Sequence, residues 1–131
     1  MDTKNSSIKL GRVSKNVERS ISISFPGDVF VYISGKNLDS FAFRYPHDYL
    51  RRIEVAKDIL LRPHFASYDA KEGMIYLFRT YYKNGIFKTY LIRIKKEKCW
   101  EFLSLTTTKE DGSLSKLKIK EIDSDRRKKK N

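Results

Sequence analysis

The dipeptide Asn84-Gly85 separates two long runs of β-branched and aromatic residues, 74–82 and 86–95. A two-residue loop of this kind is the strongest local signal for a β-hairpin, because both positions tolerate the positive φ angles of a type I′ turn. A third run, 99–107, follows a polar turn expected at 96–98. These features predict an antiparallel meander in the second half of the chain.

The segment from residue 46 to residue 62 carries apolar side chains at helical spacing. Pro46 is expected in the first turn of this helix, where a missing amide hydrogen costs nothing. Pro63 is expected to end the helix at Arg62, because it disfavours the α conformation of the residue before it. The side chains expected to point to solvent from the opposite face are Arg51, Arg52, Glu54, Lys57 and Asp58.

The remaining ordered segments are predicted to be short. Ser and apolar residues alternate strictly at 20–25, which indicates a half-buried strand, and the run at 29–33 is typical of a buried one. Further predictions are strands at 8–13 and 65–69, a helix at 38–44 capped by Asn37 or Asp39, and a last strand or docked extension at 114–122.

The order of these elements predicts one α+β domain. N-terminal strands and one or two helices are expected to pack on a four-stranded antiparallel sheet, because helix and sheet are segregated along the chain. Residues 1–18 are assigned to an N-terminal extension, 19–122 to the domain, and 123–131 to a basic tail that is expected to be disordered.

The chain is strongly basic. Its 131 residues carry a formal net charge of +12 and have a pI of about 9.8. Residues 124–131 contribute +4, so the rest of the chain carries +8 and is basic without its tail. A domain pI above about 9 is typical of nucleic-acid binders, although net charge can also serve solubility alone. A polyanion, and RNA first, is therefore the expected partner.

Several classes of protein are not favoured. Cys99 is the only cysteine, so neither an intramolecular disulfide nor a cysteine-rich metal site is expected. The sequence has no apolar run of membrane-spanning length and no signal-peptide pattern at its start, which predicts a cytoplasmic protein without a membrane partner. No glycine loop for phosphates and no metal-ligand spacing is present, so no cofactor or metal is expected.

The residues suited to chemistry on RNA fall into three groups. Metal-free cleavage uses the ribose 2′-OH as nucleophile, and the protein supplies a base, an acid and cations for the phosphate. The groups are Arg44, Tyr45, His47, Arg51 and Arg52 near the helix start, Arg79, Tyr81, Tyr82 and Lys83 at the end of the first meander strand, and Thr106, Thr107 and Thr108 at the end of the last. The sequence leaves open whether the last two groups share one end of the sheet.

Each candidate also has a structural interpretation. His47 in a first helical turn is more often a surface residue, and His64 in a connector is more often part of a turn. Tyr81 and Tyr82 at a strand end commonly pack at the rim of a sheet, although stacking on RNA bases would also suit them. Consecutive threonines are good strand formers in any case.

From residue 29 to residue 108, about three-fifths of the chain, the sequence resembles the barnase/RelE-like group of metal-independent ribonuclease domains, in the branch found in phage, mobile elements and polymorphic toxins. The matching segments are VFVYIS (29–34), NLDSFAFRYPHDYLRRI (37–53), ILLRPHFASYD (59–69), MIYLFRTYYKNG (74–85), FKTYLIRIK (87–95) and WEFLSLTTTK (100–109). The resemblance implies a helix packed on a four-stranded antiparallel sheet. It also implies RNA cleavage by transphosphorylation, which makes the protein a hydrolase of the nuclease class.

The resemblance also implies a site. Such domains often have a His just before the Pro that opens the helix, whereas this chain has Tyr45 there, with His47 two positions later. Either of these two residues takes the acid–base role, or activity has been lost and the domain only binds. The resemblance implies Tyr45, His47, Arg79, Thr106 and Thr108 as catalytic residues, with Arg79 or Lys88 holding the phosphate. Together with Lys88, the nucleic-acid-binding residues expected from the basic and aromatic groups above are Arg44, Arg51, Arg52, Tyr81 and Lys83.

Three functions remain open. The favoured one is a toxin-like, metal-independent ribonuclease acting on tRNA or another structured RNA. The alternative is a non-catalytic nucleic-acid-binding module on the same fold. A third is a protein-interaction domain, and a toxin would itself be expected to have an acidic antitoxin or immunity protein as partner.

Overall fold

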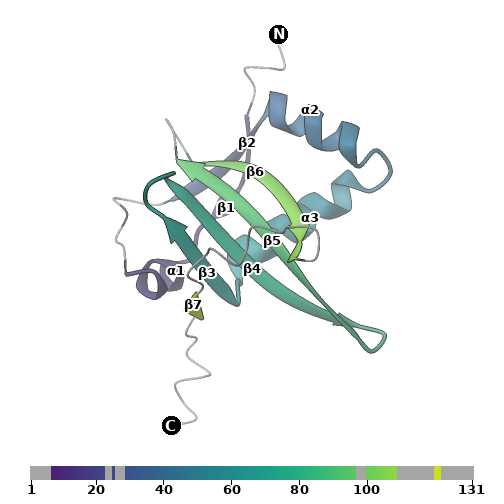
Figure 1. Ribbon diagram of the computed structural model, residues 1–131. Helices are drawn as coiled ribbons and strands as arrows, with labels where there is room; N and C mark the ends of the chain where they lie inside the picture. Colours follow the sequence, from purple (N-terminus) through teal and green to yellow (C-terminus); the bar gives the residue numbers. More distant parts are fainter. Residues whose placement is uncertain (1–6, 23–24, 26–28, 97–99, 109–119, 122–131) are drawn as a thin grey trace.

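A single mixed sheet joins the strands of the described chain (Figure 1). The structure is a computed structural model that describes residues 7–22, 25, 29–96, 100–108 and 120–121. The strand order is β1-β2-β6-β5-β4-β3-β7. The elements, in chain order, are β1 (Ser7–Arg12), α1 (Lys15–Ser20), β2 (Phe30–Ser34), α2 (Gly35–Arg44), α3 (Tyr49–Leu61), β3 (Phe65–Asp69), β4 (Met74–Lys83), β5 (Ile86–Lys96), β6 (Trp100–Thr107) and β7 (Lys120–Glu121).

The predicted α+β class is confirmed, but the sheet is larger than expected. Strands β3, β4, β5 and β6 form the predicted antiparallel group. β2 then pairs with β6 in parallel, at Val31 with Trp100, and β1 and β7 extend the two edges. The expectation of a four-stranded antiparallel sheet was therefore wrong in detail, because the β2–β6 pairing joins segments far apart in sequence and leaves no local signal.

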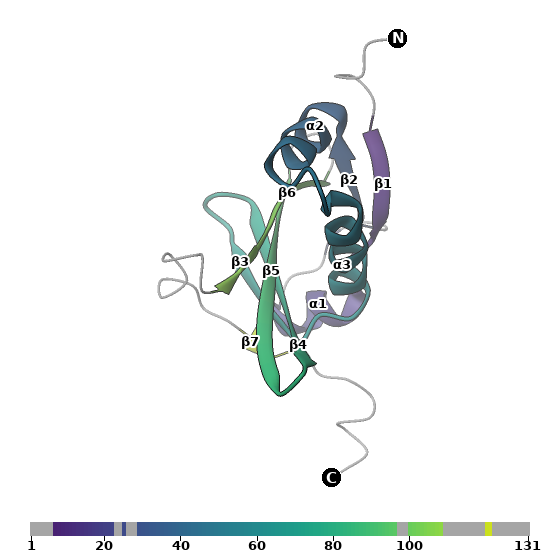
Figure 2. The same ribbon diagram turned by 90° about the vertical axis from the view of Figure 1, so that its right-hand side faces the viewer.

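The three helices lie on the same side of the sheet (Figure 2). Their apolar side chains, including the fully buried Ile59 of α3 and Val17 of α1, meet the inward side chains of the central strands. α3 packs against both β1 and β4, so it ties the N-terminal edge of the sheet to the meander. Core residues contributed by the strands include Val31, Ile33, Leu77, Ile92, Ile94, Phe102 and Leu105.

The helix ends differ from the predicted ones. α2 begins at Gly35 because the Ser34 side chain caps it, accepting a 3.1 Å hydrogen bond from the Asn37 amide; neither Asn37 nor Asp39 is the cap. α3 begins at Tyr49, so Pro46 is not in its first turn as predicted. The predicted end before Pro63 is confirmed, since Arg62 is the C-cap.

The N-terminal segment is part of the fold. β1 pairs with β2, and Val17 on α1 has no exposed surface, so the assignment of residues 1–18 to an extension was wrong for residues 7–18. The strand predicted at 20–25 is also absent from the described residues, because Ser20 ends α1 and a turn follows. Ile21 and Phe25 nevertheless pack against the core, which explains the apolar alternation without a strand.

The hairpin predicted at Asn84-Gly85 is confirmed, since φ is 54° and 80° at these residues. β3 accompanies β4 only as far as Phe78, and β6 accompanies β5 only as far as Tyr90. Beyond them the hairpin continues as a two-stranded ribbon that projects from the sheet (Figure 1, lower right). Four residue steps separate the Arg79–Tyr90 pair from the turn, which is about 14 Å at the usual rise of a strand.

Part of the predicted C-terminal structure lies outside the described residues. This applies to the turn at 96–98 beyond Lys96, to the tail at 123–131, and to the segment at 114–122 except for Lys120–Glu121, which form β7 beside β3.

Candidate nucleic-acid interface

The β4–β5 hairpin is basic throughout its length. From residue 74 to residue 96 the sequence has no Asp or Glu. The cations of this segment are Arg79, Lys83, Lys88, Arg93, Lys95 and Lys96, and its aromatic residues are Tyr76, Phe78, Tyr81, Tyr82, Phe87 and Tyr90. Such a combination of cations with aromatic rings is suited to phosphates and bases.

The side chains of the hairpin alternate between two faces. Arg79 pairs across the strands with Tyr90, and Tyr81 pairs with Lys88, so these four side chains share the face that looks toward α3. The opposite face, which the helices do not cover, carries the intervening residues Tyr76, Phe78, Thr80, Tyr82, Phe87, Thr89, Leu91 and Arg93.

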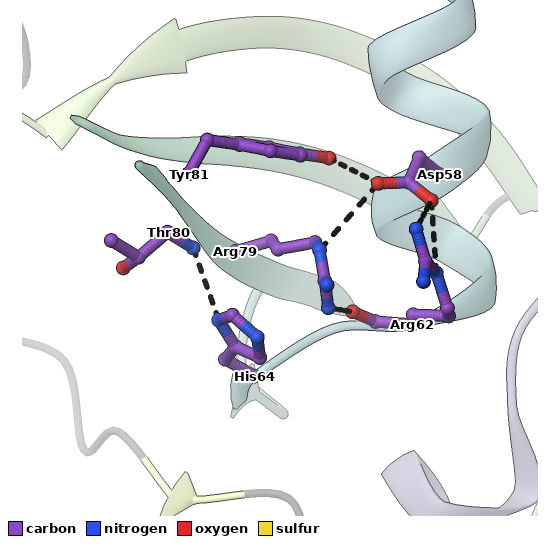
Figure 3. A network of polar contacts seen from close by, with 6 residues as sticks. All are labelled: Asp58, Arg62, His64, Arg79, Thr80 and Tyr81. Atoms are coloured by element: carbon purple, nitrogen blue, oxygen red, sulfur yellow. Dashed lines mark hydrogen bonds and ion pairs between the residues drawn. The ribbon is translucent and has the colours of Figure 1, made fainter. Parts of the chain in front are cut away.

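On the α3 side, Asp58 is the centre of a polar network (Figure 3). The Tyr81 hydroxyl donates to Oδ2 of Asp58 at 2.5 Å, and Arg62 donates to Oδ1 at 2.6 and 3.0 Å. Nε of Arg79 lies 3.5 Å from Oδ2 as an ion pair, and its Nη1 donates to the Arg62 carbonyl oxygen. The network therefore joins the end of α3 to the base of the ribbon.

The network fixes the ionisation of its members. Partial burial favours protonation of Asp58, but hydrogen bonds from Tyr81 and Arg62, together with the charges of Arg62 and Arg79, outweigh it and hold the pKa of Asp58 below its usual 3.8. Burial, together with the hydrogen bond to Asp58, raises the pKa of Tyr81 well above its usual 10. At neutral pH Asp58 is thus ionised, and both of its carboxylate oxygens accept hydrogen bonds. Its role is therefore to hold α3 and β4 together rather than to accept a proton.

The edge of β4 and the other face of the ribbon base are also held by hydrogen bonds. Nδ1 of His64 accepts a 3.1 Å bond from the Thr80 amide, and the His64 amide donates to the Phe78 carbonyl oxygen at 2.7 Å. The hydroxyls of Thr80 and Thr89 lie 2.7 Å apart across the strands. The interpretation of His64 as part of a connector is thus supported, with the added finding that it extends the edge of β4.

The second and third predicted groups lie at one end of the sheet. Arg79 pairs with Tyr90, which pairs in turn with Thr107, so these three residues form a row across β4, β5 and β6. Thr106 points to the other face, is 8% exposed, and its hydroxyl has no hydrogen-bond partner among the described residues. Thr108 lies just beyond the end of β6.

The first predicted group lies at the corner between α2 and α3. The guanidinium of Arg52 lies 3.8 Å from the Tyr45 ring centre, and that of Arg44 lies 5.5 Å away. Arg52 also pairs with Asp48 at 3.3 Å. The Tyr45 hydroxyl and Nη1 of Arg52 are buried, and neither has a hydrogen-bond partner within the described part of the chain. His47 is exposed in the turn before α3.

The predicted catalytic residues are therefore divided among separate places. Tyr45 lies at the helix corner, Arg79 is engaged by Asp58, and Thr106 points to the face away from the helices. Tyr81 packs on Tyr90 with ring centres 5.8 Å apart and is only half-exposed, so it is no free platform for a base. The predicted binding residues that are exposed are Arg44, Arg51, Lys83 and Lys88.

Asp58 is the residue that the sequence did not single out. Helical periodicity placed it with Arg52 on the solvent face, but Asp58 points to β4 and Arg52 packs on Tyr45. Its i,i+4 spacing to Arg62 was visible in the sequence. The contact with Tyr81 is a tertiary one and had no local signal.

Scans against protein-family models, curated proteins and solved structures found no significant match for this chain. Within the described residues, no helix is long and apolar enough to cross a membrane. In the same part of the chain, no three His, Cys, Asp or Glu side chains gather as metal ligands would.

Proposed function

We propose that this protein binds RNA and holds it along the β4–β5 hairpin. The observation that carries the proposal is the charge of this element, which has six cations and no carboxylate between residues 74 and 96. Lys83 and Lys88 are exposed on the projecting ribbon, and no acidic side chain of the described residues pairs with either. Exposed lysines on a projecting element suit the phosphate backbone, which supplies most of the affinity of such complexes.

The separation of the expected acid–base residues favours binding without cleavage. A general base must lie within hydrogen-bond reach of the proton it removes, and its acid partner must lie on the other side of the same phosphate. Tyr45, Arg79 and Thr106 come from a helix corner and from two faces of the sheet. This division supports the binding module over the ribonuclease.

Binding can be measured by fluorescence anisotropy with a labelled tRNA in EDTA. We expect the affinity to fall more than tenfold between about 50 and 200 mM salt, because counterions are released from the phosphates. Gel electrophoresis of the same samples should show intact RNA. The absence of binding at the lower salt concentration would refute the proposal.

Metal-independent RNA cleavage is the second candidate function, and one observation favours it. The Tyr45 hydroxyl and the adjacent Arg52 are an unpaired acid–base group and a cation at the position where the resemblance expects catalysis. RNA that is cut in EDTA by the wild type, and left whole by Tyr45→Phe, His47→Ala or Arg79→Ala, would favour this function. An acidic inhibitor protein would then be an expected partner.

A further inference from the structure

The tip of the β4–β5 ribbon exposes large apolar side chains. Tyr82, Ile86 and Phe87 are 63%, 65% and 72% exposed. The rings of Tyr82 and Phe87 pack on each other, with centres 4.7 Å apart and planes inclined by 50°. Three such side chains at the end of a projecting element, away from the core, indicate contact with another molecule.

The ribbon presents these rings on one face and its cations on the other. Tyr82 and Phe87 are directly opposite in the strand register and therefore point the same way. Lys83 pairs with Ile86 and Lys88 pairs with Tyr81, so both lysines leave the ribbon on the α3 side, each one residue from a ring. A ligand that reaches over the tip therefore meets an aromatic surface on one face and two positive charges on the other.

The base of the ribbon is held in place, so the tip is presented in one orientation. An isolated two-stranded hairpin is marginally stable. Here the Tyr81–Asp58 hydrogen bond and the Thr80–Thr89 contact fix the base, and the type I′ turn at Gly85 closes the end. Contacts that are ordered before binding reduce the entropy lost when a ligand arrives.

We propose that this tip, formed by Tyr82, Lys83, Ile86, Phe87 and Lys88, is a binding site for unpaired nucleotides and makes the protein prefer single-stranded RNA to duplex RNA. The inference rests on the proposed function. An unpaired base offers a free π face to Tyr82 and Phe87, whereas a base in a duplex is already stacked on both sides. The lysines supply charge for the neighbouring phosphates, and the hairpin itself, residues 74–96, has no carboxylate that would repel them.

The test compares one labelled 12-nucleotide RNA, as a single strand and as a blunt duplex, by anisotropy in EDTA. The wild type should bind the single strand at least tenfold more tightly. The variant Tyr82→Ala/Phe87→Ala should weaken single-strand binding by roughly 10- to 100-fold, at about tenfold for each stacked base, and should change duplex binding by less than about threefold. The matched control is Phe43→Ala/Leu50→Ala, which removes two exposed apolar side chains from the helices and should change neither affinity.

The outcomes separate this inference from the one on which it rests. Failure of the wild type to bind either RNA at low salt would overturn both. Salt-dependent binding of both RNAs with equal affinity, or an equal loss for both in the tip variant, would overturn only the preference for unpaired bases.

Vesicles of phosphatidylserine and phosphatidylcholine test a lipid surface as the occupant. Binding to them that depends on Tyr82 and Phe87, with RNA affinity unchanged in the variant, would also overturn the inference. Unchanged circular dichroism spectra confirm that the variants are folded.

Discussion

The Tyr81 hydroxyl donates a 2.5 Å hydrogen bond to Oδ2 of Asp58 and so joins the base of the β4–β5 ribbon to the last turns of α3. Arg62 and Arg79 both form ion pairs with the same carboxylate. The basic β4–β5 hairpin is thus tied to a helix through the acidic side chain of Asp58.

Asp58→Asn should lower the free energy of unfolding by about 1–3 kcal/mol, measured by urea denaturation at neutral pH. The amide keeps the shape of the side chain but removes the charge, which leaves Arg79, with only 18% of its side chain exposed, without its ion pair. The control is Glu54→Gln. Glu54 pairs with Lys57 at 3.2 Å on an exposed surface, and its loss should cost less than about 0.5 kcal/mol. Equal costs for the two variants would contradict the role given to Asp58.

The stability contributed by Asp58 should depend on pH in a defined direction. Because the pKa of Asp58 is lower in the folded protein than its usual 3.8, the folded state gains from this group above that value. The gain is lost as the pH falls below 3.8 and through the folded-state pKa. The difference in unfolding free energy between wild type and Asp58→Asn should therefore be constant near neutral pH and shrink toward about pH 2. If this difference in unfolding free energy grew on acidification, the pKa of Asp58 would not be lowered in the folded protein.

The two turn residues of the hairpin should differ in their sensitivity to substitution. Gly85→Ala forces a side chain into φ near 80° and should cost about 1 kcal/mol, whereas Asn84→Gly, at φ near 54°, should cost little because glycine accepts this conformation freely. Thermal unfolding of the two variants measures the difference. If both were neutral, the ribbon would not depend on the type I′ turn.

Removing residues 1–18 should abolish cooperative unfolding, because this deletion takes away β1 and the buried Val17 of α1. Val17→Ala in the full chain should cost about 2 kcal/mol, at about 0.8 kcal/mol per buried methylene-sized group plus a cavity term. Ile8→Ala, at a position that is 50% exposed, should cost clearly less and is the matched control. If the deletion variant still unfolded cooperatively, the N-terminal segment would not be required for the fold of the domain.

The sequence predicted those parts of the fold that depend on neighbours in the chain. The turn at Asn84-Gly85 determines the hairpin register, and Pro63 ends α3, each through its own backbone preference. The alternation of Ser and apolar residues at 20–25 wrongly predicted a strand. Ile21 and Phe25 pack against the core, but Ile21 does so from the end of α1 and Phe25 from the segment that follows it. The parallel pairing of Val31 with Trp100 depends on the whole domain, and no pattern within either strand indicates it.

The same distinction applies to the candidate site. Lys83 was predicted from its place at the end of the first meander strand and Lys88 from the family resemblance, and both are exposed because they flank the turn. Asp58 was assigned to solvent because its partner Tyr81 lies on a strand 23 positions further along the chain. Helical periodicity tells which residues share a face, and the packing of that face against β4 is a property of the assembled domain.

The central claim is that the hairpin carries the contacts to RNA phosphates, and the salt dependence of binding tests it most directly. The logarithm of the affinity for a single-stranded RNA is plotted against the logarithm of the salt concentration for the wild type and two double variants. Lys83→Gln/Lys88→Gln should reduce the magnitude of the slope by about 1.4, at about 0.7 for each lost phosphate contact. Lys36→Gln/Lys71→Gln removes two exposed lysines elsewhere and should leave the slope unchanged. Equal slopes for the wild type and the hairpin variant would contradict the account.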